Sequence, residues 1–245
     1  SHDLCTALSA VTGYLSLLGL SSSAQIPQST IREAEFHEKR LFQVIKLINE
    51  LLDLEKIEAN RLEIDPRFIY AETAVQCAIS EIENEAKEKR NSIEDFESDL
   101  EIYADTHRLG QLLSNLLAAS IELAKEGSSI SLWASESEGR TIIRITIPDA
   151  SVPSNIGNAN IGNANYGDTL FMRYKATEDA NPALPLAAEL IRLHGGTIQF
   201  QTAETGIQDT KKTEASFWFT LPIGAQNGAS VVDMTQKDQA IREIR

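Results

Sequence analysis

Residues 129–147 read SISLWASESEGRTIIRITI, and this stretch decides the fold of the second half of the chain. Apolar and polar residues alternate within SISLWAS and again within TIIRITI, so that Ile143, Ile145 and Ile147 fall on one face. Alternation with a period of two is typical of strands that have one buried face. The stretch is therefore expected to form two paired strands.

Helices and further strands are predicted on both sides of this pair. Apolar residues recur at helical spacing over residues 71–88, about 106–124 and near 183–193. A strand is indicated by RLEIDPRFIY (61–70), where Pro66 favours a place near a sheet edge or bulge. A second antiparallel pair is indicated by GGTIQFQT and ASFWFTLPI. This order favours an α+β fold, a two-layer sandwich with helices on one face of the sheet.

The first sixty residues have a helical pattern. Apolar residues recur there at alternating spacings of four and three, the a/d seam of packed helices: Leu4, Leu8, Val11, Leu15 and Leu18. After the breaker stretch GLSSSAQIPQS, a longer helix is expected from about Ser29 to Ala59. Two amphipathic helices bury little surface alone, so the hairpin 1–60 is expected to dimerise into a four-helix bundle. Residues 61–223 then form the sandwich domain, and 224–245 a polar tail or linker.

The composition argues against several classes of protein. The net charge of −14 disfavours binding to nucleic acid or to an anionic membrane surface. Cys5 and Cys77 have no CxxC spacing, which argues against a disulfide framework or a zinc site. There is no apolar run of about 18–20 residues and no signal peptide. A cytoplasmic setting is expected. Because Met is absent at position 1, we expect a fragment, to which an upstream membrane anchor or sensor domain can belong.

One segment has a biased composition. Residues 155–168 read NIGNANIGNANYGD and nearly repeat the run Asn-Ile-Gly-Asn-Ala. Asn and Gly favour turns, and lengthening a loop costs little entropy, so a flexible loop expansion is expected here. The sequence gives this repeat no further role.

Several stretches occur in an order that resembles the transmitter region of a sensor histidine kinase. The H box of that family is matched by SHDLCTALSAVTGYLSLL, the end of its second bundle helix by INELLDLEKIEANRLEI, and its N box by ADTHRLGQLLSNLLAAS. Its F box resembles LFMRY, and the last third of its ATP-binding domain resembles LIRLHGGTIQF and SFWFTLPI. The resemblance covers residues 1 to about 223. It implies a dimerisation and histidine-phosphotransfer bundle, followed by an ATP-binding domain of the GHKL type with the Bergerat-type ATPase fold.

The resemblance implies that His2 is the phosphoacceptor, supported by Asp3 and Thr6. A histidine with an ordinary pKa near ~6.5 is largely neutral at cytoplasmic pH. Asp3 can orient the ring and accept its proton, and Thr6, four residues on, shares a helix face with His2 and can position a water. The family's acid-x-x-Thr spacing, which supports dephosphorylation of the response regulator, is intact here. Cys5 and Ala7 depart from the usual Arg and Pro. Alone, a helix-start histidine beside an acid is commonplace.

The nucleotide motifs are only partly present. Asn115 keeps the N-box position that the resemblance assigns to Mg²⁺, but Ala119 stands where a second Asn is expected and Glu122 where a Lys or Arg is expected. Alanine cannot ligate a cation that takes oxygen ligands, and a carboxylate repels a triphosphate. Asp149 holds the position of the Asp that binds the adenine amino group. Ser151 stands at a glycine position after it, where glycine would permit close backbone approach.

The remaining glycine positions are also altered. Pro153 lies in the same turn, and the family's Gly-x-Gly falls on Asn181, Pro182 and Ala183. Helix N-termini bind phosphate through backbone N–H groups, and proline has none to donate. Pro182 nevertheless suits a helix start, and the two glycines of LHGG are expected to end that helix and begin a strand.

Three functions stay open from the sequence. The first is an ATP-dependent protein-histidine kinase that phosphorylates itself on His2, with ATP and Mg²⁺ as cofactors by family resemblance. The second is an ATP-independent pseudokinase, a phosphotransfer or phosphatase module whose partners are a response regulator receiver domain and another histidine kinase. The altered nucleotide motifs favour this second function. The third is a non-catalytic, dimeric signalling scaffold. All three agree with a histidine kinase in two-component signal transduction as the family.

Overall fold

The computed structural model of the chain describes residues 11, 13, 28–152, 182–205 and 212–224. The chain divides into two compact units, with a boundary between Leu62 and Glu63. In the described residues the first unit is helical, and the second contains all of the strands. No helix of these residues is long and apolar enough to cross a membrane.

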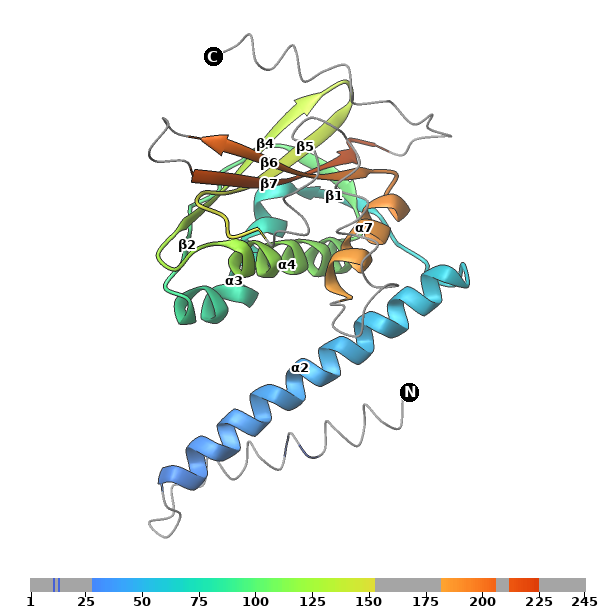
Figure 1. Ribbon diagram of the computed structural model, residues 1–245. Helices are drawn as coiled ribbons and strands as arrows, with labels where there is room; N and C mark the ends of the chain where they lie inside the picture. Colours follow the sequence, from blue (N-terminus) through green and yellow to red (C-terminus); the bar gives the residue numbers. More distant parts are fainter. Residues whose placement is uncertain (1–10, 12, 14–27, 153–181, 206–211, 225–245) are drawn as a thin grey trace. The chain divides into compact units, whose positions relative to one another are not determined.

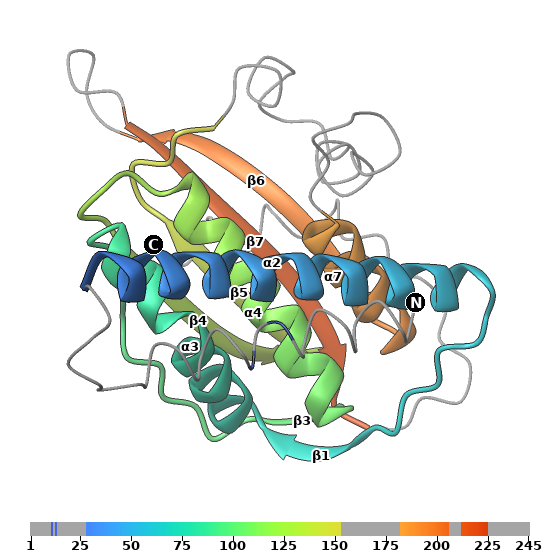
Figure 2. The ribbon, with the colours of Figure 1, turned by 90° about the horizontal axis from the view of Figure 1, so that it is seen from below.

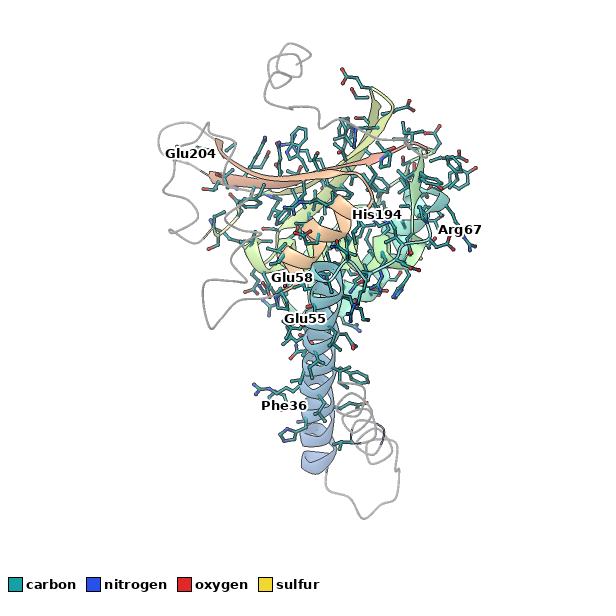
Figure 3. All side chains as sticks on the ribbon, turned by 90° about the vertical axis from the view of Figure 1, so that its right-hand side faces the viewer. Phe36, Glu55, Glu58, Arg67, His194 and Glu204 are labelled. Atoms are coloured by element: carbon teal, nitrogen blue, oxygen red, sulfur yellow. The ribbon has the colours of Figure 1, made fainter. Side chains whose placement is uncertain are left out.

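The helical unit is described by one long helix, α2 (Gln28–Glu58). Its bounds agree with the predicted helix within one residue at each end. Several of its apolar side chains are exposed, including Phe36 and Phe42, and Phe36 is labelled in Figure 3. The first predicted helix lies almost entirely outside the described residues, so the hairpin and the four-helix bundle stay predictions.

In its described part, the second unit combines a five-stranded sheet, a two-stranded sheet and three helices. The elements, in chain order, are β1 (Arg67–Tyr70), α3 (Ala71–Glu88), β2 (Ser92–Ile93), β3 (Glu101–Ala104), α4 (Thr106–Leu123), β4 (Ser129–Ser137), β5 (Arg140–Ile147), α7 (Ala183–Leu193), β6 (Thr197–Thr205) and β7 (Lys212–Pro222). The larger sheet has the order β2-β4-β5-β7-β6. Its β2–β4 pair is parallel and its other pairs are antiparallel, as is the separate β1–β3 pair.

The larger sheet and the helices form two layers. Figure 1 shows α3, α4 and α7 on one face of the five-stranded sheet, and Figure 2 shows the same helices from their own side. The alternation of β5 explains this arrangement, because Ile143, Ile145 and Ile147 are all fully buried. Opposite them on β7, Phe219 pairs with Ile143 and Phe217 with Ile145. Apolar faces of strands and helices bury each other in this way, so the predicted α+β fold with one covered sheet face is confirmed.

The predicted strand pairs are both present. β4 and β5 are joined by a tight turn in which Glu138 has a φ of 52° and Gly139 a φ of 70°. Two consecutive residues with positive φ form the hairpin turn whose twist matches that of paired strands. β6 and β7 form the second antiparallel pair. The predicted helices over 71–88 and 183–193 have the observed bounds, and the third ends at Leu123 rather than Ala124.

Two features differ from the predictions. The strand expected over 61–70 is restricted to Arg67–Tyr70 and pairs with β3 in the small sheet. Pro66 has no N–H, and the N–H of Asp65 donates to a side chain, so neither residue contributes a donor to a strand ladder. β2 and β3 were not predicted, because strands of two and four residues are too short to display a clear alternation.

On the sheet face opposite the helices, a row of large side chains crosses three strands. Trp133 on β4 pairs with Arg144 on β5, which pairs with Trp218 on β7. The guanidinium of Arg144 lies 4.5 Å from the centre of the Trp218 ring, in cation–π geometry. Trp133 is 52% exposed, so this face of the sheet is open to solvent in the described part of the chain.

Candidate functional site

The residues predicted to contact a nucleotide lie on and around α4, and the N-terminal end of this helix is firmly fixed. Asp105 is the N-cap, and its side chain accepts hydrogen bonds from the backbone N–H groups of His107 (3.0 Å) and Arg108 (3.1 Å). An N-cap carboxylate satisfies donors that have no partner inside the helix. Its other oxygen accepts from the N–H of Asp65 (3.0 Å), which lies between α2 and β1 in the sequence.

The same end of α4 is hydrogen-bonded to the end of α7 through His194. The N–H of Asp105 donates to His194 Nε2 (3.0 Å), and His194 Nδ1 lies 2.7 Å from the carbonyl oxygen of Leu190. Because Nε2 accepts, the proton of the neutral ring is on Nδ1, which donates to Leu190. His194 is only 5% exposed and is labelled in Figure 3. The ring therefore joins two helices from inside the unit.

Burial and hydrogen bonds shift the pKa values of both groups. Burial disfavours the charged ring and lowers the pKa of His194, although the Leu190 carbonyl and the charge of Asp105 act in the opposite direction. For Asp105, burial alone would raise the pKa. The hydrogen bonds from the N–H groups of Asp65, Arg108 and His107 together outweigh burial, and the pKa of Asp105 is lowered. At neutral pH the pair is a neutral ring and a carboxylate.

The N-box residues lie further along α4. Asn115 is buried, with 1% of its surface exposed. Ala119 is half-buried and Glu122 is exposed near the C-terminal end of the helix. Asn115 therefore lies within the packed unit, whereas the two positions that depart from the family pattern are the accessible ones.

The C-terminal end of α4 is held by Lys89 and by the segment after β5. Lys89 Nζ donates to the carbonyl oxygens of Ile121 (3.2 Å) and Glu122 (3.3 Å). A cation at this end compensates the negative end of the helix dipole. The N–H of Ser151 donates to the carbonyl of Leu123 (2.7 Å). Ser151, at a predicted glycine position, thus has its N–H engaged by the protein itself.

Asp149 follows β5 in a left-handed conformation, with a φ of 51°. Its Oδ2 accepts a hydrogen bond from Lys212 Nζ at the start of β7, in an ion pair in which Asp149 is 24% and Lys212 62% exposed. Its Oδ1 is buried and has no hydrogen-bond partner among the described residues. The next residue, Ala150, donates its N–H to the carbonyl of Thr213 (2.7 Å). Among the described residues, one oxygen of the carboxylate is therefore paired with Lys212, and the other is a buried acceptor without a hydrogen-bond donor.

The start of α7, where the phosphate motif is expected, is described from Pro182 onward. α7 begins at Ala183, directly after Pro182. Ala183 is buried, and Pro182 has no N–H. Asn181 lies outside the described residues.

ATP is the cofactor implied by the resemblance, and several of the positions expected to contact it are among the described residues. The buried acceptor Oδ1 of Asp149 suits a donor such as the amino group of a base. Of the positions expected to meet phosphate and Mg²⁺, Asn115 keeps a buried amide oxygen, whereas Ala119 offers a methyl group, Glu122 a carboxylate and Pro182 no donor. No group of three or more His, Cys, Asp or Glu residues suited to a metal occurs in the described part of the chain.

The H-box residues His2, Asp3 and Thr6 lie outside the described residues, as do Pro153 and the repeat at 155–168. The structure brings Asn115, Ala119 and Glu122 together on α4, and the backbone of Ser151 to the end of the same helix. Their roles in binding or catalysis stay predictions.

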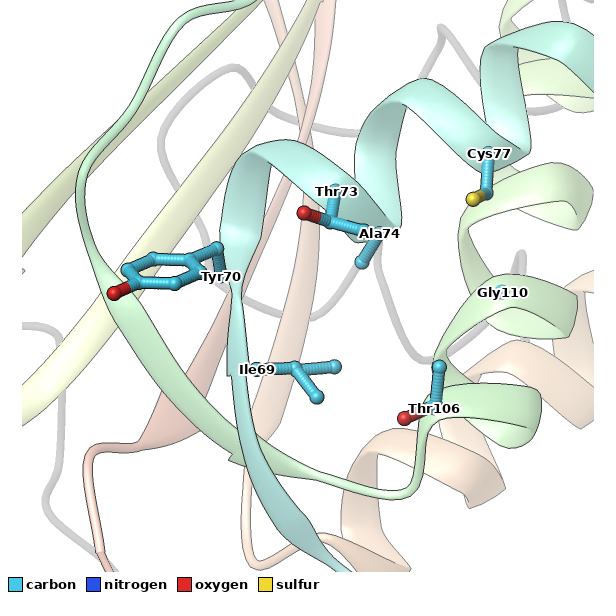
Figure 4. A pocket seen from close by; sticks show the side chains of 7 residues that line it. All are labelled: Ile69, Tyr70, Thr73, Ala74, Cys77, Thr106 and Gly110. Atoms are coloured by element: carbon cyan, nitrogen blue, oxygen red, sulfur yellow. The ribbon is translucent and has the colours of Figure 1, made fainter.

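An apolar cavity of about 250 Å³ lies elsewhere in the unit (Figure 4). It is lined from β1, α3 and the first turns of α4, with Tyr70, Cys77 and Gly110 among its walls. Neither Asn115 nor Asp149 lines it. The cavity is therefore separate from the predicted nucleotide position.

Three residues of this region were not predicted from the sequence. Lys89 and Lys212 belong to charged surface segments, and charge alone gives no sign that their ammonium groups reach α4 and Asp149. Asp105 carries a detectable signal, because an Asp directly before a predicted helix is a typical N-cap. His194 was recognised only as part of the family's LHGG motif.

The comparisons with known proteins agree with this fold. No family model matches the chain. The sensor histidine kinase GacS of Pseudomonas protegens is 24% identical over 230 residues, which cover 90% of this chain and 24% of GacS. The chain spans about a quarter of the length of the curated relatives it matches.

Two solved structures share the fold. The histidine kinase AdeS of Acinetobacter baumannii has a TM-score of 0.60 at 16% identity, covering 92% of this chain and 99% of AdeS. Full-length ShkA, solved in complex with AMPPNP, has a TM-score of 0.61 at 20% identity, covering 90% of this chain and 44% of ShkA. The resemblance to the transmitter region of sensor histidine kinases is confirmed.

Proposed function

We propose that this chain is the transmitter part of a two-component sensor histidine kinase, in which His2 carries a phosphoryl group that is relayed to a response regulator. The observation that carries this proposal is the similarity to a sensor histidine kinase over 90% of the chain. The H-box residues His2, Asp3 and Thr6 support it at the level of sequence.

The proposed organisation assigns residues 1–60 to a dimerisation and phosphoacceptor hairpin, 61–223 to the ATPase-like domain and 224–245 to a tail or linker. The exposed Phe36 and Phe42 of α2 support a homodimer, because large apolar side chains in water favour burial against a partner. A cytoplasmic location and a receiver-domain partner follow from the same function.

The proposed chemistry of the H box is a reversible transfer. A ring nitrogen of neutral His2 attacks the phosphorus of a receiver's aspartyl phosphate, so that an N–P bond forms while the O–P bond to the receiver breaks. The receiver's carboxylate leaves, and Asp3 holds the proton of the other ring nitrogen. The reverse reaction passes phosphate on to a receiver. Thr6 orients a water for hydrolysis of the receiver's phosphate.

We further propose that the phosphoryl group on His2 comes from another protein, as in a pseudokinase, rather than from ATP bound by this chain. Glu122 and Ala119 support this alternative, because they replace a cation and an oxygen ligand at accessible positions of α4. The ion pair between Lys212 and Asp149 adds to it. A bound base has to compete with this internal partner for one carboxylate oxygen.

Two measurements test these proposals. The first is binding of labelled Mg-ATP to the whole chain and to the double variant Ala119→Asn/Glu122→Lys, which restores the expected N-box residues. We expect no detectable binding of Mg-ATP to the parent chain and measurable binding to the variant. Tight binding of Mg-ATP to the parent chain would contradict the pseudokinase proposal.

The second measurement is transfer of labelled phosphate from a phosphorylated receiver domain to this chain. Labelling is expected for the parent chain and not for His2→Gln, while Ser9→Ala, outside the H-box triad, serves as the matched control. Equal labelling of parent and His2→Gln would exclude His2 as the acceptor. No labelling from any of a panel of receivers would favour the scaffold function.

A further inference from the structure

One carboxylate in the second unit has two separate tasks. Asp105 Oδ1 accepts from the N–H groups of His107 and Arg108 and so caps α4. Asp105 Oδ2 accepts from the N–H of Asp65, forty residues earlier in the chain. Asp65 lies three residues beyond the boundary at Leu62, on the segment through which the helical unit is connected to the second unit. The helix cap and the connection therefore share one side chain.

The backbone of the same residue has a third task. The N–H of Asp105 donates to His194 Nε2, and His194 Nδ1 donates to the carbonyl of Leu190 in the last turn of α7. A hydrogen-bonded chain thus runs from Asp65 through Asp105 and His194 to α7. Each link is between 2.7 and 3.0 Å long, within the range of well-formed hydrogen bonds.

The far end of this chain of bonds has little freedom to move. After His194, a Cβ added to Gly196 would lie 2.0 Å from the carbonyl oxygen of Thr220 and 2.9 Å from the side chain of Ile191. The backbones of α7 and β7 are therefore in close contact at this turn. Arg140 strengthens it by donating to the carbonyl of Gly195 (2.9 Å). A shift at Asp105 has to be met by the end of α7 or by a broken hydrogen bond.

We propose that Asp105 and His194 are positioning residues that couple the connecting segment at Asp65 to both α4 and α7. These are the helices that carry the positions of the N box and of the phosphate motif. A displacement of Asp65 removes one hydrogen bond from the Asp105 carboxylate and loosens the α4 cap, and through His194 it reaches α7. This inference rests on the proposed function only for the assignment of nucleotide motifs to α4 and α7.

A matched pair of variants isolates the first link. Asp65→Pro removes the N–H that donates to Asp105, and Asp65→Ala keeps it, while both remove the exposed ion pair with Arg67. Because Asp65 precedes Pro66, its backbone favours the extended region, which a proline can adopt. Hydrogen exchange of the whole chain is measured at the amides of His107, Arg108 and Asp105. Exchange is expected to be faster in Asp65→Pro than in Asp65→Ala by more than about threefold.

The second pair tests whether His194 belongs to the same unit. His194→Leu removes both ring nitrogens, whereas His194→Gln keeps an acceptor that can meet the N–H of Asp105. The amide of Asp65, which donates to Asp105 and not to His194, is expected to exchange faster in His194→Leu and to be largely restored in His194→Gln. A merely local packing role would leave Asp65 unchanged in both variants.

Two results would overturn the proposal. One is equal amide exchange at Asp105, His107 and Arg108 in the two Asp65 variants. The other is an exchange rate of the Asp65 amide that is the same in both His194 variants as in the parent chain. If His194→Leu does not fold, hydrogen exchange of the two Asp65 variants alone tests the proposed coupling. None of these measurements uses nucleotide, receiver or the chemistry of His2. Failure of the coupling is therefore distinct from failure of the proposed phosphotransfer function.

Discussion

The two ends of α4 are held by opposite kinds of chemistry. At the N-terminal end, the half-buried Asp105 makes hydrogen bonds of 3.0–3.1 Å to the buried His194 and to the backbone N–H groups of Asp65, His107 and Arg108. At the C-terminal end, the exposed side chain of Lys89 donates to two carbonyl groups at 3.2 and 3.3 Å, beside the backbone hydrogen bond from Ser151 to Leu123 (2.7 Å). The loss of Asp105 would leave several backbone N–H groups without their acceptor, whereas the loss of the exposed Lys89 ammonium would leave carbonyl groups that water can reach. The N-terminal end is therefore expected to contribute more to stability.

This difference follows the division between scaffold and site. The N-terminal end keeps the residues that hold the helices together, whereas the accessible positions toward the C-terminal end, Ala119 and Glu122, depart from the pattern expected of a nucleotide site. A fold can survive changes at its binding surface as long as its internal hydrogen bonds and packing remain. Substitutions at either end of α4 test whether the N-terminal end contributes more to stability than the C-terminal end.

The largest effect is expected from Gly196→Ala, in the turn after His194. A methyl group there would overlap the carbonyl of Thr220, so backbone has to move, and the free energy of unfolding is expected to fall by about 3 kcal/mol or more. Chemical denaturation measures the loss. Gly110→Ala on α4 is the control, because nothing lies within 4 Å of the added group. A helical alanine in its place should be neutral or stabilising by up to about 1 kcal/mol.

Asp105→Ala should have the next largest effect. It removes the cap of α4 and the acceptor for Asp65, and a lost N-cap costs about 0.5–2 kcal/mol. Asp105→Asn keeps acceptor capacity and should recover part of the loss. Denaturation midpoints of the three proteins check this order. Equal stability of Asp105→Ala and the parent chain would contradict the view that this end is the stronger one.

Acidification should lower the free energy of unfolding through the groups at the N-terminal end of α4. Burial lowers the pKa of His194 below its ordinary 6.5, so the unfolded chain binds a proton more readily than the folded one. The free energy of unfolding should therefore fall as the pH drops from about 6.5 through the lowered value. The lowered pKa of Asp105 adds a loss that begins only below its ordinary 3.8. Thermal unfolding across this range is the measurement, and His194→Gln should abolish the upper part alone.

The smallest effect is expected from Lys89→Met at the C-terminal end. It removes a cation near the last carbonyls of α4, an interaction worth about 0.3–1 kcal/mol at low salt. Repeating the denaturation at high salt should shrink the difference between Lys89→Met and the parent chain, because exposed charges are screened. A loss as large as that of Asp105→Ala would make the two ends equivalent.

The fold was largely predictable from the sequence, because its determinants are periodic. Alternation in TIIRITI gave the buried isoleucines of β5, and helical spacing gave α3, α4 and α7 within a residue or two. The failures lie where periodicity is too short or interrupted. β2 has two residues, and the strand predicted over 61–70 was shortened because Asp65 is hydrogen-bonded to Asp105. A long-range hydrogen bond of this kind leaves no local pattern.

For the candidate site, the sequence predicted which positions belong to the motifs but not which residues contact them. Counting along the motifs located Asn115, Ala119, Glu122 and Asp149, and the first three do share one helix. The sequence did not predict that Lys212 pairs with Asp149, because the partner of a surface lysine depends on strand register, which is set by the whole sheet. The chemistry of the site is thus decided by neighbours far away in sequence.

The row of side chains on the open sheet face has a practical consequence for spectroscopy. Trp133 and Trp218 are the two tryptophans of the chain, and both lie in the sheet. Indole fluorescence excited at the red edge therefore reports on the second unit alone, while far-ultraviolet circular dichroism also records α2. If the two signals unfold at different denaturant concentrations, the units melt independently and a two-state description fails. The arrangement of two indoles in one sheet makes the independence of the units measurable without any label.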